Sequence, residues 1–315
     1  MTGVTAILTT LAPRKELGIV LDALEQLPVD EVIVVENGPN EELEGRPGIR
    51  VLRPGRNLGI MSRNMAAKEA SNDFLLMLDD DSYPLPGAIE TLTKALEDDP
   101  RLAVAAGLVR DVDLERGTEK ERGDDTFDYW LGRGQTDSAP ESGLPSFFFP
   151  EGASIVRRDP FLEAGGFFEP FFHTCAGLDI ATVLLGRGWD VRYFPSARFV
   201  HLKAKIGRDK TEMLHLRTRN QLWYFYRHFP ATVAARRIPA YLLFDLLEST
   251  KSGAFRAWAR GVHDAWGERA AVRGTREPLP RGVIRRAELN RGRLHLRLVA
   301  LRAARLARQL RPRST

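Results

Sequence analysis

The stretch Phe74-Leu-Leu-Met-Leu78, followed at once by Asp79-Asp80-Asp81, tells most about the fold of this chain. Five apolar residues in a row predict a strand, and a run without polar alternation is typical of a strand that is covered on both faces. The three aspartates then mark the carboxyl end of this strand. Carboxylates so close together repel one another, so they destabilise the fold unless a cation or a ligand compensates their charge.

The aspartate triplet has two interpretations. Carboxylate oxygens suit Mg²⁺ or Mn²⁺, and such ions usually take one or two carboxylates together with substrate phosphates. A divalent ion at this point would neutralise a diphosphate leaving group. Alternatively, the triplet is a solvated acidic turn before a helix, because Ser82 and Pro84 follow it. The triplet by itself favours neither interpretation.

Similar apolar runs precede the triplet. They cover residues 4–9, 31–35 and 49–52, and helix-like stretches lie between them. Strands that alternate with helices predict an α/β fold, with a mainly parallel sheet flanked by helices. In such sheets ligands bind beyond the carboxyl ends of the strands, which is where Thr9, Glu36 and the aspartates fall.

The second half of the chain has a different pattern. Residues 111–145 are polar and lack a clear period, which predicts an irregular excursion on the acceptor side. An aromatic-rich helix is expected over residues 211–229, and leucines on an Arg-rich segment predict more helix over 283–310. We therefore expect a catalytic domain over residues 1–230 and a basic helical C-terminal extension over residues 231–315.

Charge is unevenly distributed along the chain. The net charge is +4, but residues 1–200 contain 20 Lys and Arg against 34 Asp and Glu, whereas residues 201–315 contain 26 against 8. The basic part is either a set of solvated helices or a surface for an anionic partner, such as peripheral contact with an anionic membrane. A nucleic acid is not expected as a partner, because no recognised nucleic-acid-binding motif occurs.

Cysteine usage and hydropathy bear on the compartment. The single cysteine, Cys175, cannot form an internal disulfide or a Cys-rich zinc site. The N-terminus lacks the basic and apolar regions of a secretory signal, and the apolar run at 238–247 is too short to span a bilayer. We expect a cytoplasmic protein, with peripheral attachment to the membrane left open.

Six segments in a fixed order resemble glycosyltransferase family 2, which has the GT-A fold. They read VTAILTT from residue 4, VIVVENG from 32, NLGIMSRN from 57, FLLMLDDD from 74, GASIVRRDPFLEAGGFFEPFF from 152 and FVH from 199. The resemblance covers roughly residues 4–228. It implies an inverting glycosyltransferase that uses a nucleotide-diphosphate sugar as donor and Mg²⁺ or Mn²⁺ as cofactor.

The resemblance also implies a donor site. Thr9 and Glu36 would line the pocket for the nucleotide base, and Arg63 would reach toward the nucleotide or its phosphates. Asp79 would approach the ribose or the sugar, with Asp80 beside it on the donor side.

Two residues would serve the metal. The resemblance implies that Asp81 holds the ion and that His201 is another metal ligand or a diphosphate contact. A lone histidine after an aromatic strand is more often structural, and its place in the family pattern is what favours the functional interpretation.

The general base is where this chain departs from the family. Inverting transfer needs a carboxylate that takes the proton of the acceptor hydroxyl. The family has an acidic pair where this sequence has Ala176-Gly177, and only Asp179 of that acidic cluster remains. Asp179 is the first candidate base, Glu151 the second and His173 the third. Alternatively, Asp179 is a structural residue at the N-terminus of a helix.

Two rival functions stay open at this stage. A protein of the same fold could bind a nucleotide sugar without catalysis, because the acidic pair is missing. A nucleic-acid-binding protein could act through its basic tail instead. For a transferase, the acceptors of the family include polysaccharides, lipid-linked glycans and small natural products.

Overall fold

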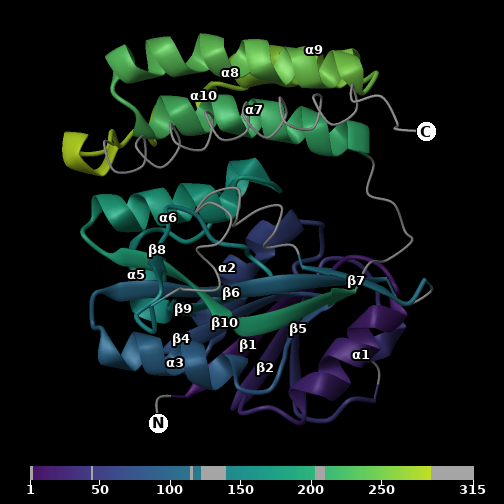
Figure 1. The fold of residues 1–315 in the computed structure, drawn as a ribbon. Coiled ribbons are helices and arrows are strands. Elements are labelled where there is room, and N and C mark those ends of the chain that lie inside the picture. Colours follow the sequence, from purple (N-terminus) through teal and green to yellow (C-terminus); the bar gives the residue numbers. More distant parts are fainter. Residues whose placement is uncertain (1–2, 44, 114–115, 122–139, 203–209, 285–315) are drawn as a thin grey trace, which may run out of the picture.

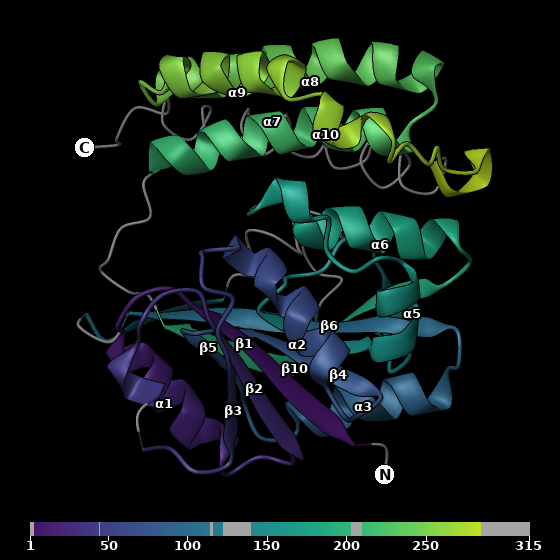
Figure 2. The same ribbon diagram turned by 180° about the vertical axis from the view of Figure 1, so that it is seen from behind.

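The computed structural model describes residues 3–43, 45–113, 116–121, 140–202 and 210–284. One mixed sheet of ten strands forms the centre of the molecule, with helices on both faces (Figures 1 and 2). Its strands follow the order β3-β2-β1-β4-β9-β6-β10-β5, while β7 pairs with β6 and β8 with β10. The α/β fold expected from the sequence is confirmed.

The strands are β1 (Val4–Thr10), β2 (Glu31–Glu36), β3 (Ile49–Leu52), β4 (Phe74–Asp79), β5 (Ser82–Pro84), β6 (Leu102–Asp113), β7 (Thr118–Glu121), β8 (Leu144–Pro145), β9 (Ala153–Arg157) and β10 (Asp190–Leu202). The helices named below are α1 (Lys15–Leu24), α2 (Arg63–Glu69), α3 (Ala88–Asp98), α5 (Arg158–Glu163), α6 (Ala176–Gly186), α7 (Lys210–His228), α8 (Ala231–Lys251), α9 (Phe255–Gly267) and α10 (Ala270–Arg273).

The sheet is parallel in its first half and mixed in its second half. Strands β3, β2, β1 and β4 run in the same direction, as the apolar runs predicted. Strand β9 lies between β4 and β6 and is antiparallel to both, whereas β6 and β10 are parallel to each other and run in the direction of the first four strands. The sheet is therefore mainly parallel, as expected, with β9 and the short strands β5, β7 and β8 running the other way. Strand β9 begins beside Leu78, at the carboxyl end of β4, and runs back across the sheet. This reversal brings Glu151, just before β9, to the edge that carries the aspartates.

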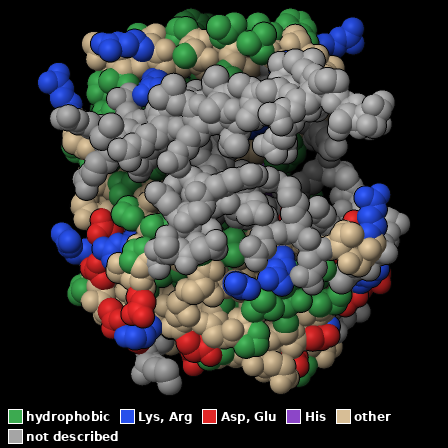
Figure 3. Space-filling view, viewed as in Figure 1, with side chains coloured by type: hydrophobic (Ala, Val, Ile, Leu, Met, Phe, Trp, Pro, Cys, Tyr) green, Lys and Arg blue, Asp and Glu red, His purple; other side chains and the backbone are tan. Residues whose placement is uncertain are grey.

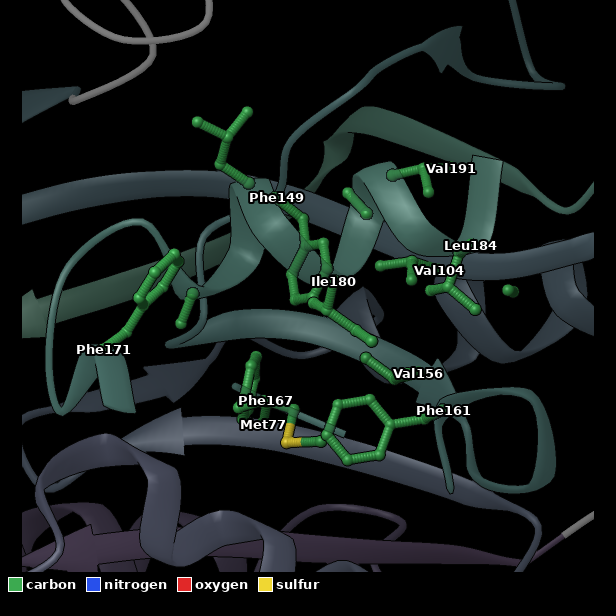
Figure 4. Close-up of a cluster of buried hydrophobic side chains, with 14 of the residues drawn as sticks. Met77, Val104, Phe149, Val156, Phe161, Phe167, Phe171, Ile180, Leu184 and Val191 are labelled. Atoms are coloured by element: carbon green, nitrogen blue, oxygen red, sulfur yellow. The ribbon is translucent and has the colours of Figure 1, made fainter. Parts of the chain in front are cut away.

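Two apolar clusters hold the helices on the sheet. One cluster, drawn in Figure 4, joins side chains such as Met77 of β4, Phe161 of α5 and Ile180 of α6. The other cluster packs Leu17 of α1 and Leu92 of α3 against the opposite face. Because both faces are covered, continuous apolar strands are stable here.

A second layer of helices lies over α6. Helices α7, α8 and α9 form this layer, with α8 and α9 on the side away from the sheet (Figures 1 and 2). Helix α7, expected to end the catalytic domain, packs against both α8 and α9. Among the described residues, none of the helices is both long and apolar enough to cross a bilayer.

Candidate active site

The side chain of Asp79 sits at the carboxyl end of β4, in register with Thr9 of β1. Arg63 of α2 is fully buried, and its Nη2 donates hydrogen bonds to the Leu78 carbonyl at 2.6 Å and to Asp79 Oδ1 at 2.7 Å. Arg63 therefore orients Asp79, whereas the resemblance implied that it reaches toward the nucleotide. Gly152 borders Asp79 closely, since a Cβ at that position would lie 2.4 Å from Asp79 Oδ2.

The other two aspartates are buried and share one cation. Arg14, between β1 and α1, places its Nη1 3.2 Å from Asp80 Oδ1 and 3.2 Å from Asp81 Oδ2. Burial raises the pKa of the Asp80 carboxyl to about 6; Arg14 opposes this rise, and the charge of Asp81 adds to it. The compensating cation that the triplet requires is thus supplied in part by the chain itself.

His201 lies beside Asp81, as its predicted role requires. The backbone N–H of Leu202 donates to the Asp81 carbonyl at 2.7 Å, which brings the end of β10 to the triplet. His201 Nε2 is 3.4 Å from Asp81 Oδ1, and its Nδ1 is 3.0 Å from Asp111 Oδ1. Asp111 thus lies behind the ring of His201, a position in which a carboxylate commonly supports a metal-binding histidine.

These residues fit a divalent ion that takes few protein ligands. A carboxylate oxygen and an imidazole nitrogen face each other across a short gap, and both are suitable donors for Mn²⁺. Within the described residues, no group of three or more His, Cys, Asp or Glu side chains could hold an ion by itself. The remaining ligands would have to be donor phosphates and water, which is usual for Mg²⁺ and Mn²⁺.

Short polar loops border the strand ends at Thr9 and Glu36. Glu36 Oε1 accepts a hydrogen bond from the Asn40 backbone at 2.9 Å, and its Oε2 pairs with Arg53 Nε at 2.5 Å. Asn37 Nδ2 donates to the Gly59 carbonyl at 3.0 Å, which ties this loop to the segment before α2. Thr9 and Glu36 thus stand at adjoining strand ends, where the resemblance places the base pocket.

Glu151 lies next to Gly177, in the segment where the family has its acidic pair. Its Oε1 accepts a hydrogen bond from the backbone N–H of Gly177 at 2.5 Å, at the first turn of α6. A Cβ on residue 177 would lie 3.2 Å from that oxygen but only 2.2 Å from the Phe149 carbonyl, so a side chain would not fit there. Burial raises the pKa of Glu151, and the charge of nearby Asp79 acts in the same direction.

Asp179 has a different environment. Its carboxylate is 2% exposed and contacts the Arg227 guanidinium and, at 2.7 Å, His228 Nε2, both at the end of α7. These contacts join α6 to the helical layer. This environment agrees with the second interpretation of Asp179, that of a structural residue. Among the described residues, its contacts are with α7 and not with the aspartate triplet.

The backbone before α6 is strained. Phe172, Thr174 and Cys175 have φ angles of 60°, 61° and 59°, a region that residues other than glycine seldom adopt. Asn220 of α7 holds this segment, since its Nδ2 donates to the carbonyls of Phe171 at 2.9 Å and of His173 at 2.5 Å. Such strain is kept where the surrounding structure enforces it, and it commonly marks functional sites.

A cavity of about 580 Å³ lies between this segment and α7. Glu151, His173 and Cys175 line one side, and Arg217 and Gln221 line the other. Burial raises the pKa of the Cys175 thiol to about 12, so this cysteine is not a thiolate nucleophile near neutral pH. The cavity is large enough for part of a sugar acceptor, with the Glu151 carboxylate in its wall.

Sequence reasoning missed two residues of this site. Arg14 follows the end of β1 and Asp111 lies near the end of β6, so the rule that ligands gather at carboxyl strand ends could have found both. Asn220 lies in the middle of α7, and no local sequence pattern specifies its contact with the backbone before α6.

Comparison with known proteins agrees with this geometry. The family described as Glycosyl transferase family 2 matches residues 6–165. The N-acetylglucosaminyl-diphospho-decaprenol L-rhamnosyltransferase of two Mycobacterium tuberculosis strains is 26% identical over 231 residues, which cover 62% of this chain and 73% of that protein.

Two solved structures share the fold. A crystal structure of GalNAc-T7 with UDP, GalNAc and Mn²⁺ superposes with a TM-score of 0.57 at 13% identity, over 73% of this chain and 49% of that one. The mannosyltransferase PcManGT from Pyrobaculum calidifontis, in complex with GDP-Man and Mn²⁺, gives 0.53 at 17% identity, over 84% and 75%. This chain thus spans about half the length of the first structure. The chain belongs to glycosyltransferase family 2 and is a glycosyltransferase.

Proposed function

We propose that this enzyme transfers a sugar, with inversion, from a nucleotide-diphosphate sugar to a hydroxyl of an acceptor. The observation that carries the proposal is the meeting of Asp79, Asp81 and His201 at one edge of the sheet, with Glu151 next to them. Residues far apart in the chain thus form one site. Asp79 and Asp81 lie where the donor would bind, and Glu151 lies in the wall of the adjoining cavity.

Asp81 and His201 would hold Mg²⁺ or Mn²⁺. When bound, such an ion supplies positive charge that stabilises a diphosphate leaving group. Arg14, which pairs with Asp80 and Asp81, would move its guanidinium onto the diphosphate as the ion takes its place. Thr9 and Glu36 would contact the nucleotide base, and Asp79, oriented by Arg63, would contact the ribose or the sugar.

Glu151, in preference to Asp179, is the general base of this proposal. Its carboxylate lies in the cavity wall next to the donor site, whereas Asp179 is buried against Arg227 and His228. The acceptor oxygen would attack the anomeric carbon while the Glu151 carboxylate takes its proton. The bond from that carbon to the diphosphate oxygen breaks, the nucleoside diphosphate leaves, and the configuration inverts.

A lipid-linked glycan is the acceptor class that we favour. The support is the rhamnosyltransferase relative, which is named for an acceptor that carries a diphospho-decaprenol group. A polysaccharide or a small natural product stays an alternative. The division of the chain after residue 230 and a cytoplasmic location also stay predictions.

The test is transfer of sugar with inversion, measured on purified full-length protein. A thermal-shift screen of UDP-, GDP- and dTDP-sugars with Mn²⁺ first identifies the donor, because a ligand at a hundredfold excess over Kd stabilises by about 2.7 kcal/mol. Turnover and the anomeric configuration of the product are then measured by NMR. Metal-dependent donor affinity without turnover would instead favour a sugar-nucleotide-binding protein.

Two variants test the metal site independently. Asp81→Asn should abolish the Mn²⁺-dependent part of nucleoside diphosphate affinity and leave the fold intact. Asp98→Asn, an exposed aspartate on α3, is the matched control and should bind as wild type does. Unchanged Mn²⁺-dependent affinity in Asp81→Asn would remove Asp81 from the proposed site.

A further inference from the structure

The outer surface of the α8–α9 hairpin carries large apolar side chains. Leu243 is 60% exposed and Trp266 is 72% exposed, and Leu247 and Phe255 are also exposed. The space-filling view shows hydrophobic side chains along the upper edge of the molecule, where α8 and α9 lie (Figure 3). Scattered single residues of this kind are ordinary, but a group of large ones on two neighbouring helices needs a partner.

Helical spacing places these residues on one face. Leu243 and Leu247 are four residues apart on α8, and Phe255 and Trp266 are eleven apart on α9, so each pair shares one side of its helix. The two helices contact each other and form the layer farthest from the sheet (Figures 1 and 2). We define these four residues as the outer apolar face.

Cations border the outer apolar face. Arg236 and Lys251 are exposed, and they lie seven residues before Leu243 and four residues after Leu247, on the same stripe of α8. Arg256 is exposed directly after Phe255. In Figure 3, Lys and Arg side chains stand at both ends of the apolar edge.

The two hairpin carboxylates whose side chains are described, Asp245 and Asp264, are turned inward. Asp245 of α8 accepts hydrogen bonds from Arg217 and Thr218 of α7, both at 2.6 Å, and Asp264 of α9 pairs with His215 Nε2 at 2.8 Å. The outer face is therefore apolar and cationic, while its counter-charges are bound by the helix beneath.

We propose that the outer apolar face of α8–α9 docks on the surface of an anionic lipid bilayer. Apolar side chains, with a tryptophan among them, would enter the interface between headgroups and acyl chains, and the bordering cations would pair with anionic headgroups. A bilayer suits this face better than a protein does, because cations border the apolar side chains and the described carboxylates of both helices bind α7.

A cavity beside the face fits the same partner. It has a volume of about 500 Å³ between α7, α8 and α9, and its lining is almost wholly apolar, with Leu242 and Trp266 among the lining residues. Arg269 and Arg273 are the charged residues of that lining. A lipid chain can occupy such a cavity while its headgroup meets the arginines. The docking is independent of the sugar donor and concerns a different surface from the catalytic cavity.

The first experiment measures co-sedimentation of the full-length protein with vesicles of phosphatidylglycerol and phosphatidylcholine, and with phosphatidylcholine alone. The variant Leu243→Gln/Leu247→Gln should weaken binding to the anionic vesicles by at least about tenfold. The variant Arg236→Gln/Lys251→Gln should reduce the preference for anionic lipid. Ile19→Gln, an exposed apolar residue on α1, is the control and should bind as wild type does.

A second measurement reports on the face itself. Vesicles should shift the tryptophan emission of the wild type to the blue, and Trp266→Phe should lose most of that shift while its circular dichroism is unchanged. Turnover in solution should be the same in all variants, so a failure of docking can be told from a failure of the transferase.

Several outcomes would overturn the proposal. Failure of the wild-type protein to sediment with anionic vesicles is one of them. Equal binding by the leucine variant and the wild type is another, because other parts of the chain would then carry the binding. A wild type that is dimeric and becomes monomeric in the leucine variant would assign the face to a second copy of this chain.

Discussion

At the scale of single residues, the site depends on one carboxylate that the family pattern does not supply. Glu151 occupies the space beside Gly177, where the Phe149 carbonyl leaves no room for a side chain. Glu151 lies just before β9, and its side chain is long enough to reach the backbone of Gly177 from there. The chain thus keeps a carboxylate at the cavity although the acidic pair is absent.

Glu151→Gln should lower turnover by at least about a hundredfold, because glutamine cannot accept the proton, and it should leave donor affinity nearly unchanged. Since burial raises the pKa of Glu151, the wild-type rate should rise with pH through a range above that of an ordinary glutamate. Steady-state kinetics with a pH profile check both statements. Full turnover in Glu151→Gln would exclude this residue as the base.

The raised pKa of Glu151 also makes the stability of the fold depend on pH. A raised pKa means that the folded protein binds the proton more tightly than the unfolded chain, so stability falls as pH rises from the ordinary glutamate pKa through the raised one. Glu151→Gln should therefore be more stable than wild type near neutral pH, and this advantage should vanish in acid. Urea unfolding at both pH values measures the difference.

Arg14 allows a separate prediction about the aspartates. Removal of its guanidinium in Arg14→Ala leaves Asp80 and Asp81 without that cation, so the metal-free protein should lose about 1–3 kcal/mol of stability. Mn²⁺ should restore more stability to this variant than to wild type, because the ion replaces the lost charge. Thermal denaturation with and without Mn²⁺ tests this, and equal Mn²⁺ responses would contradict it.

At the scale of elements, helix α7 shapes the cavity through the segment before α6. Asn220 binds two carbonyls of the strained backbone, and Arg219 adds a hydrogen bond from Nη2 to the Pro170 carbonyl at 3.0 Å. The positive φ angles at Thr174 and Cys175 persist because these contacts hold them. The α6 N-terminus, which binds Glu151, is therefore positioned from the helical layer.

Asn220→Ala should release this segment. Without the amide, the strained residues can relax, so hydrogen exchange at residues 172–177 should speed up more than in the sheet strands, and turnover should fall. Hydrogen exchange followed by mass spectrometry measures the local effect, with β4 peptides as internal reference. A uniform increase over the whole chain would mean that Asn220 serves global stability alone.

At the scale of the whole molecule, the sheet and the helical layer are joined by buried charges. Asp179 of α6 binds Arg227 and His228 of α7, and the three side chains are all buried. Loss of one partner of such a cluster leaves uncompensated buried charge, which commonly costs about 3–5 kcal/mol. The two parts of the molecule should therefore unfold together.

Asp179→Asn should lower the stability of the whole chain by roughly that amount, in one transition, and keep turnover per folded molecule. Urea unfolding followed by circular dichroism and by tryptophan fluorescence should give coincident curves. Two separate transitions would contradict the coupling, and lost turnover in a folded variant would return Asp179 to the list of candidate bases.

The sequence by itself determined the α/β fold, the parallel strands β1 to β4, the family and the edge that carries the aspartates, because apolar periodicity and motif order are local properties of the chain. Only the tertiary structure decided which side chains of the site meet. Arg14 pairs with Asp81, and Asp111 lies beside His201. Glu151 faces the cavity, whereas Asp179 is buried against α7. Such contacts join residues far apart in the sequence, and their distances depend on how strands and helices pack. The antiparallel course of β9 was likewise beyond local patterning, since an apolar strand reads the same in either direction.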